Sequence, residues 1–386
     1  MIKIPINNSL TKNSLNIFKT AKKYDRISPR NVGDDMKLRM PEYCKNFRCI
    51  ADKCQDNCCI GWEIDIDPDS AEYYENVKGS FGEKLRKNII KSEVCSFKLN
   101  KERCPFLNEN NLCEIIINLG EDKLCQICSD HPRFFEWYSD IKEGGIGLCC
   151  EEAARIIVPH KEKFSTYEVA CEDEGCDDYN EDLYNMLTFA RDEIINTLED
   201  NSLEFSTKLY TIINYAFEIQ SMADNYQFDK MPINKLYPAE ETAPNVKAFL
   251  ECFTCLEPID EHWQKYLGDL IINSDTLQEK VSSYKADFDL YLKNIAVYFI
   301  WRYFLKGVYD EEFLSKVMLM AVSCAMIKLM YINETCLGIN LTDETCSMIA
   351  KRYSKEIEYS QENLDKIYDM VYENPAFNAK NILSIL

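Results

Sequence analysis

The sequence lacks a hydrophobic run long enough to cross a membrane. Its longest uncharged apolar stretch, residues 317–327, lies between Lys316 and Lys328 and is far shorter than the about 20 residues of a typical membrane span. The N-terminal segment also lacks an unbroken apolar core after its first lysine, so it does not read as a secretory signal. We therefore expect a cytoplasmic protein with no membrane partner.

Basic residues are scarce relative to acidic ones. The 386-residue chain carries 44 Lys and Arg against 65 Asp and Glu, a formal net charge of -21. Such a surface repels nucleic acid unless a local basic patch compensates, so we expect no nucleic-acid partner. The charge favours a cationic partner such as a lysine-bearing protein, although the acidity could equally serve only solubility.

Cysteine is the residue that the chain has in excess. Of its 19 cysteines, twelve lie between Cys44 and Cys150 at short, irregular spacings. In a reducing cytosol such a segment more often binds metal than forms disulfides, and thiolates carried on loops suit a soft metal centre. A disulfide framework is the competing interpretation.

Composition and periodicity divide the chain into four stretches, and the fold class that they predict is mainly α. We expect a basic, flexible extension over residues 1–35, an irregular cysteine-rich α+β metal-binding unit over 36–165, an acidic linker over 166–182, and an α-helical domain over 183–386.

Local patterns predict the elements within these stretches. Alternation of apolar and polar residues predicts short strands over 62–67 and 112–117, and helices are expected over 70–91, with Asp69 or Ser70 as the N-cap, and over 151–158. Apolar residues at helical spacing predict further helices over residues 183–198, 204–223, 244–256, 260–273, 276–306, 310–333 and 342–373.

A series of short motifs runs through the cysteine-rich unit. In order they are Pro41-Glu-Tyr43, Phe47-Arg-Cys49, Cys54, Cys58-Cys59, Trp62, Cys104-Pro-Phe-Leu107, Leu112-Cys113-Glu-Ile115, Gly120-Glu121, Leu124, Cys128-Ser-Asp-His-Pro-Arg133 and Leu148-Cys-Cys150-Glu-Glu-Ala-Ala-Arg155. Together they resemble the flagellin lysine N-methylase family, which is related to zinc- or iron-chelating cysteine-cluster proteins. The resemblance is strong over residues 40–160 and weaker over the helical half, where Tyr291-Leu-Lys-Asn294 is similar to a helix of the family.

The resemblance implies methylation of lysine side chains on flagellin, with S-adenosylmethionine as the donor and with the assistance of a 4Fe–4S cluster, or of zinc in addition or instead. Carried over by position, the metal ligands fall on Cys49, Cys54, Cys58, Cys59, Cys104, Cys113, Cys128 and Cys150. Two further cysteines, Cys125 and Cys149, stand where the family has serine, so the choice of ligands stays open. His131 and Glu151 stand where it has tyrosine and proline.

No motif locates the site of the methyl donor. The glycines of Gly144-Gly145-Ile-Gly147 are expected to form a turn, and Cys54-x3-Cys58 lacks the third cysteine of radical enzymes because position 61 is glycine. Arg133 and Arg155 are candidates to bind the donor's carboxylate or the sulfur of a cluster, or they are structural arginines. His131 is a candidate ligand or a turn residue.

A second class of function fits the same residues. The cysteines could hold an iron–sulfur cluster or zinc in a non-catalytic redox or structural module, with the helical domain binding a partner. Metal analysis together with an assay for methyl transfer separates the two.

Overall fold

The computed structural model describes residues 36–61, 64–101, 103–171, 173, 179–228, 230–237, 243–284 and 288–386. The extension predicted over residues 1–35 lies outside the described residues, as do Trp62 and Glu63 at the start of the first predicted strand and Cys176 in the predicted linker. All described residues belong to one unit, Met36–Leu386.

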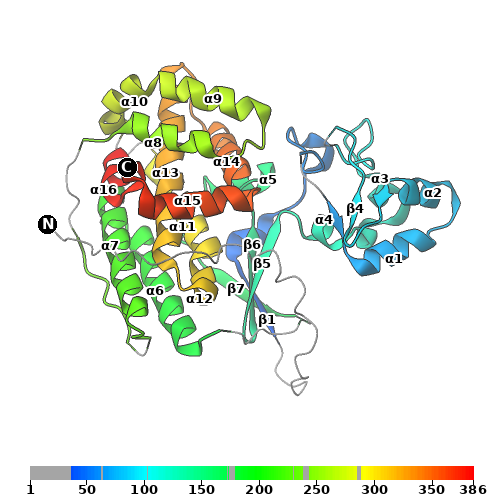
Figure 1. Cartoon of the computed structure of the whole chain (residues 1–386), viewed down its shortest axis with the longest axis horizontal. Coiled ribbons are helices and arrows are strands. Elements are labelled where there is room, and N and C mark those ends of the chain that lie inside the picture. Colours follow the sequence, from blue (N-terminus) through cyan, green and yellow to red (C-terminus); the bar gives the residue numbers. More distant parts are fainter. Residues whose placement is uncertain are drawn as a thin grey trace. The chain divides into compact units, whose positions relative to one another are not determined.

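A four-stranded sheet is built from two distant parts of the sequence (Figure 1). Its strands, in spatial order, are β5 (Arg133–Tyr138), β6 (Ile141–Ile146), β1 (Lys37–Pro41) and β7 (Thr166–Ala170). The hairpin β5–β6 is antiparallel, β1 runs parallel to β6, and β7 is antiparallel to β1. The stretch predicted as an acidic linker, residues 166–182, therefore begins with a strand.

The glycine cluster in β6 is not the turn that the sequence suggested. Gly144 and Gly145 lie inside the strand, opposite Phe135 and Phe134 of β5. A Cβ atom on Gly144 would lie 2.8 Å from the Phe135 ring. The glycines therefore leave room for aromatic rings to lie across the neighbouring strand.

A second, smaller sheet and four short helices make up the rest of the cysteine-rich region. The strands, in spatial order, are β2 (Asp65–Ile66), β4 (Cys95–Phe97) and β3 (Ile89–Ile90). The helices are α1 (Pro68–Asn76), α2 (Gly79–Lys87), α3 (Glu114–Leu119) and α4 (Gln126–Asp130).

Two predictions in this region are wrong. The helix expected over residues 70–91 is split into α1 and α2, and α1 begins earlier than expected, because Asp67 caps it and Pro68 occupies its first position. The strand expected over 112–117 is instead the helix α3, which begins after Cys113 and ends at Leu119, before Gly120 with its φ of 104°.

The second half is helical, as predicted. Its helices, together with the one that follows Cys150, are α5 (Glu151–Ile157), α6 (Glu181–Glu199), α7 (Phe205–Asp224), α8 (Val246–Cys252), α9 (Glu261–Ile272), α10 (Ser274–Lys280), α11 (Asp289–Tyr303), α12 (Gly307–Asp310), α13 (Phe313–Cys336), α14 (Asp343–Glu358), α15 (Gln361–Glu373) and α16 (Ala379–Ile385). Short 3-10 turns lie at Glu42–Asn46, Ala51–Lys53, Glu121–Lys123, Phe253–Cys255, Val281–Tyr284, Phe304–Lys306 and Pro375–Phe377. The two longest predicted helices are each broken. The stretch 276–306 holds most of α10, which begins at Ser274, and all of α11; the stretch 342–373 holds α14 and α15, the second of which is capped by Ser360.

Helix α13 is the centre of the helical region (Figure 1). It packs against α7, α11, α14, α15 and α16. Within the described chain it is the one helix long and apolar enough to cross a membrane by length and composition, but its most apolar window is 100% buried in the protein. A helix that is apolar on all sides belongs in a core.

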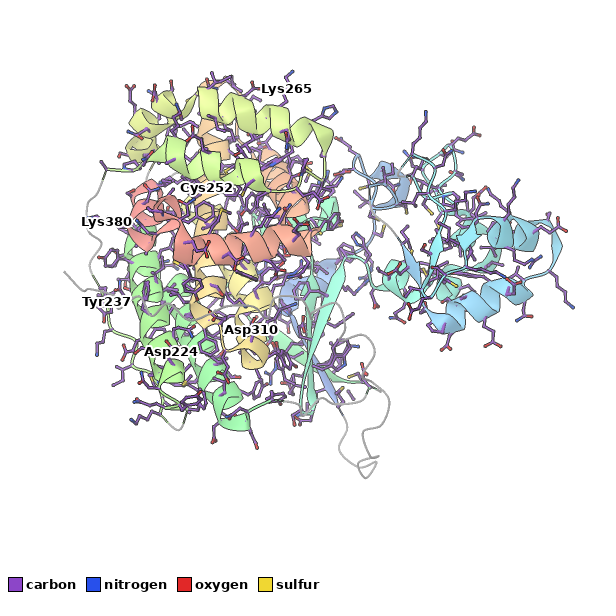
Figure 2. The ribbon with its side chains drawn as sticks, viewed as in Figure 1. Asp224, Tyr237, Cys252, Lys265, Asp310 and Lys380 are labelled. Carbon is purple, nitrogen blue, oxygen red and sulfur yellow. The ribbon has the colours of Figure 1, made fainter. Side chains whose placement is uncertain are left out.

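The buried Lys316 of α13 forms an ion pair at 2.6 Å with Asp310, which Figure 2 labels at the end of α12.

Two hydrophobic cores hold these elements together. The larger core includes Tyr138 and Ile146 of the four-stranded sheet as well as the helices from α5 to α16. The smaller core lies in the cysteine-rich region around Tyr74, Phe97 and Phe106. The sheet that contains β1, β5 and β6 is therefore packed with the helical half, and the cysteine loops are packed around a core of their own.

Candidate functional site

Most of the cysteines of the first half fall into two groups, which we name the inner and the outer thiols. The inner thiols are Cys59, Cys104, Cys113, Cys125 and Cys128, all of which belong to or pack against the smaller core. The outer thiols are Cys54, Cys58, Cys149 and Cys150, which lie near Glu151 and Tyr359. The groups adjoin each other, because the Cys58 thiol donates a hydrogen bond to Cys59 and this bond, together with burial, raises the pKa of Cys58.

Backbone contacts bring the inner thiols together. The N–H of Cys104 donates to the carbonyl of Cys59 at 2.9 Å, and a β-bridge joins Leu107 to Cys113. Cys125 stands at the N-cap position of α4, and its carbonyl accepts the N–H of Ser129 at 2.9 Å. Three loops and a short helix therefore direct their cysteines toward one small core.

The pKa values of the inner thiols reflect this proximity. The Cys128 thiol donates a hydrogen bond to Cys125, which lowers the pKa of Cys125. Burial, with smaller contributions from Cys113 and Cys125, raises the pKa of Cys104 to about 11. Thiols with raised pKa values are neutral at pH 7, and binding a metal would have to displace their protons.

The outer thiols meet at the start of α5. The Cys54 thiol donates to the Glu151 carboxylate at 3.4 Å, and burial followed by the charge of Glu151 raises the pKa of Cys54 to about 12. Cys150 stands at the N-cap position of α5, and burial raises the pKa of its thiol to about 12. Burial also raises the pKa of Cys149 to about 11, although the Tyr359 hydroxyl donates a hydrogen bond to its sulfur.

The loop that carries Cys54 and Cys58 is tied to the helical half through Asp56. The ammonium of Lys355 in α14 donates to the Asp56 carboxylate at 2.9 Å, and Lys351 donates to it as well. These ion pairs lower the pKa of Asp56 although burial opposes the shift. Helix α14, almost 300 residues further along the chain, thus holds in place a loop that has little regular structure of its own.

A buried polar network holds the Cys149–Cys150 turn from the other side. The N–H of Leu148 donates to the Tyr298 hydroxyl at 3.0 Å, and this hydroxyl donates to the Glu358 carboxylate at 2.8 Å. Arg302 ion-pairs with Glu358 at 2.9 Å, and the Glu358 side chain is 0% exposed. Helices α11 and α14 therefore fix the backbone next to two of the outer thiols.

The donor chemistry of the two groups suits a soft metal centre, because nine thiols and the His131 imidazole lie in this region. Within the residues that the structure describes, however, no three Cys, His, Asp or Glu side chains lie close enough together to hold a metal ion. The thiols lie in the same region but do not form a closed site, so their side chains would have to move closer to one another to bind a metal ion.

The structure gathers seven of the eight cysteines predicted as ligands. Cys49 is the exception: its thiol is exposed and accepts a hydrogen bond from the nearby N–H of Ala51 at 3.4 Å. Cys125 and Cys149 were left out of the predicted set, yet each lies within one of the groups. The spacing Cys125-x2-Cys128 and the adjacency of Cys149 to Cys150 were the available signals.

The two arginines predicted to bind a cofactor differ in their surroundings. Arg155 is occupied by carboxylates, because it contacts Glu344 and Glu151 at 2.7 Å each. Arg133 is exposed, stacks over the Phe47 ring at 5.4 Å and lines a cleft. His131 contacts Cys58 by a hydrogen bond and lies 6.3 Å from the Tyr359 ring, so it adjoins the outer thiols.

An open cleft lies beside α4, which we name the α4 cleft. Its volume is about 750 Å³. Its lining comes from β2, from the start of α1, from the loop before β4 and the first residue of β4, from α4 with His131 after it, and from β5. Its lining combines the carboxylates of Asp65, Asp67 and Asp130 with the aromatic rings of Phe135 and Trp137.

Comparison with models of protein families shows to which family the chain belongs. Residues 191–385, half of the chain, match the model of the FliB lysine N-methylase C-terminal domain. The chain therefore belongs to the FliB lysine N-methylase family. The match confirms the family that the cysteine motifs indicated, and it falls on the helical half, where the resemblance of motifs was weaker.

Individual relatives share a shorter stretch. The lysine-N-methylases of Salmonella choleraesuis and Salmonella typhimurium are each 26% identical over 130 residues, which cover 31% of this chain and 31% of theirs. The flagellar biosynthetic protein FliU of Salmonella muenchen is 26% identical over 130 residues, which cover 31% of this chain and 75% of that protein. The matched region thus spans about a third of the two lysine-N-methylases. No solved structure matches the chain.

Proposed function

We propose that this protein methylates lysine side chains of flagellin, with S-adenosylmethionine as the methyl donor. The proposal rests on the match of the helical half to the FliB lysine N-methylase family model. The flagellar name of one relative supports flagellin as the substrate. The net charge of -21 suits a substrate that presents lysine.

The reaction places clear demands on the protein. A lysine ammonium has a pKa of about 10.4 in water, so it must lose its proton before its nitrogen can attack. The neutral nitrogen then bonds to the methyl carbon while the carbon–sulfur bond of the donor breaks, and the sulfur leaves as a neutral thioether. The protein must therefore bind a cationic side chain and accept a proton from it.

The inner thiols are the residues that we propose to hold a 4Fe–4S cluster, with zinc as the alternative metal. When bound, such a cluster supplies a negatively charged, redox-active centre. The outer thiols adjoin it, and His131 and Tyr359 lie next to them. Tyr298 and Glu358 position the Cys149–Cys150 turn through the hydrogen bonds described above.

Two measurements on anaerobically purified protein test the proposal. The first is the content of iron, sulfide and zinc per chain, and the second is transfer of labelled methyl groups from S-adenosylmethionine to flagellin. Cys128→Ser should lower the metal content, whereas Cys252→Ser, at a buried cysteine of α8 (Figure 2), should not. Bound metal without methyl transfer would favour a non-catalytic redox or structural module instead.

A further inference from the structure

The wall of the α4 cleft that β5 forms is aromatic. Arg133, Phe135 and Trp137 alternate along the strand, so their side chains share one face of the sheet. The absence of a side chain on Gly144 lets the Phe135 ring lie across the neighbouring strand. Lys142 of β6 stands directly opposite Trp137 in the hairpin, which puts it on the same face.

This face already holds an ammonium group of the chain itself. The Nζ atom of Lys142 lies 4.4 Å from the centre of the Phe135 ring and 4.8 Å from that of Trp137. It also contacts the Asp173 carboxylate at 2.7 Å. Two aromatic faces and a carboxylate are the groups that bind a lysine ammonium and its methylated forms.

The rest of the cleft lining is largely acidic. Asp65, Asp67, Glu93 and Asp130 line it, and the basic residues among its lining are Arg133 and His131. Asp67 is used structurally, because its carboxylate accepts the N–H groups of Ser70 at 2.9 Å and Gln126 at 2.7 Å. Asp65 is exposed at the surface of β2, which leaves it available to a ligand.

The cleft also shares a wall with the inner thiols. Gln126, Ile127 and Asp130 of α4 line it, and the same short helix carries Cys128 and begins after Cys125. A cation in the cleft would thus lie against the element that brings two thiols into the proposed metal centre.

We propose that the α4 cleft binds the acceptor lysine of the protein substrate. The aliphatic stem of the lysine packs against Phe135 and Trp137, and its ammonium group lies near the carboxylates of Asp65 and Asp130. The identity of the substrate rests on the proposed function. The cationic character of the ligand rests on the charge and the aromatic wall of the cleft alone.

Binding of flagellin to the full chain tests this site. The double variant Asp65→Asn, Asp130→Asn keeps the shape of both side chains and the acceptor that Asp130 offers to the Gln126 side chain at 2.8 Å. It should weaken the affinity for fluorescently labelled flagellin by roughly tenfold, since hydrogen bonds to charged groups are lost. Asp224→Asn, at an exposed carboxylate at the end of α7 (Figure 2), is the matched control and should bind as the wild type does.

Chemical acetylation separates recognition of lysine from recognition of other flagellin surfaces. Flagellin with acetylated lysines should bind the wild type as weakly as the double variant binds unmodified flagellin. Equal affinity of the double variant and the control for unmodified flagellin would overturn the assignment.

The assay for methyl transfer keeps this inference apart from the proposed function. If the double variant methylates flagellin with an unchanged KM, the cleft is not the lysine site even though the proposed function holds. If the wild type binds flagellin through the two carboxylates but transfers no methyl group, the cleft assignment stands and the proposed function fails.

Discussion

The side chain of Glu151 accepts a hydrogen bond from the backbone N–H of Gln55 at 2.8 Å. The carboxylate is 2% exposed and also contacts Arg155 at 2.7 Å. The bond joins the loop that carries Cys54 and Cys58 to the first turn of α5, directly after Cys150. One buried carboxylate thus holds together two of the segments that supply the outer thiols.

Replacement of Glu151 should therefore loosen the outer thiols. Glu151→Ala leaves the N–H groups of Gln55 and Asp56 without an acceptor, which costs about 1–3 kcal/mol of stability. We expect a lower midpoint in urea unfolding and less metal per chain. Glu152→Ala is the control, because Glu152 lies on the same turn, is 25% exposed and contacts Arg155 at 3.5 Å. Identical unfolding of the two variants would contradict the role given to Glu151.

The stability of the protein should depend on pH through Glu356. Burial raises the pKa of this carboxyl to about 7, although the N–H groups of Ile259 and Asp260 oppose the shift. In the unfolded chain the pKa is about 4.3, so between about pH 4.3 and 7 the folded protein binds more protons there. The contribution of Glu356 to stability is therefore full below this window and declines as the pH rises through it.

Comparison with Glu356→Gln isolates this contribution. The free energy of unfolding of the wild type should fall relative to that of the variant as the pH rises from about 4.3 to 7, by at most about 3 kcal/mol because each pKa unit corresponds to about 1.4 kcal/mol. Urea unfolding at several pH values measures the difference. A difference that stays constant across the window would show that the folded carboxyl titrates normally.

The sequence predicted the helical half well where the periodicity was long and uninterrupted. The helix expected over 310–333 is α13, Phe313–Cys336, and the one expected over 204–223 is α7, Phe205–Asp224. The breaks were missed, because a turn such as that before Ser360 changes the apolar pattern little. The strand expected over 112–117 was wrong. The β-branched residues of α3 favour a strand by propensity, but only Ile115 of this helix is buried, and packing rather than propensity decides the conformation.

The sequence predicted the chemistry of the candidate site, but it did not predict the residues that hold the thiol-bearing loops in place. The density of cysteines between Cys44 and Cys150 indicated a thiol-rich metal centre, and the family resemblance then implied most of the individual thiols. The residues that hold them are remote: Lys355 lies 299 positions from Asp56. Neither Tyr298 nor Tyr359 belongs to a motif that the sequence analysis singled out. Nothing in a single sequence marks such long-range hydrogen bonds.

The buried ion pair between Arg191 and Glu143 should be costly to break. Two hydrogen bonds of 2.5 and 2.7 Å join them, with exposed fractions of 2% and 5%. Arg191→Met leaves a buried carboxylate without its main partner, so we expect a loss of about 3–5 kcal/mol in the free energy of unfolding. Arg39→Met is the control, because Arg39 contacts Glu143 at 3.3 Å but is 24% exposed, and it should cost about 1 kcal/mol or less.

A double substitution tests whether charge is the reason. Glu143→Leu combined with Arg191→Met removes both charges, and it should recover most of the stability lost in Arg191→Met alone. A double variant as unstable as the single one would mean that the loss comes from packing, for example from the Arg191 guanidinium that stacks 4.3 Å from the Trp301 ring.

Gly144 makes room for the aromatic wall of the cleft. A methyl group at Gly144 would lie 2.8 Å and 2.9 Å from atoms of the Phe135 ring, so Gly144→Ala forces that ring to move. Overpacking of this kind costs about 1–3 kcal/mol, and the displaced ring should also weaken the binding of flagellin. Gly268→Ala is the matched control, because no atom lies within 4 Å of the added methyl group in α9. This second variant should gain up to about 1 kcal/mol from helix propensity and bind flagellin unchanged. If Gly144→Ala lowers stability but leaves flagellin binding intact, Phe135 supports the sheet without contacting the substrate.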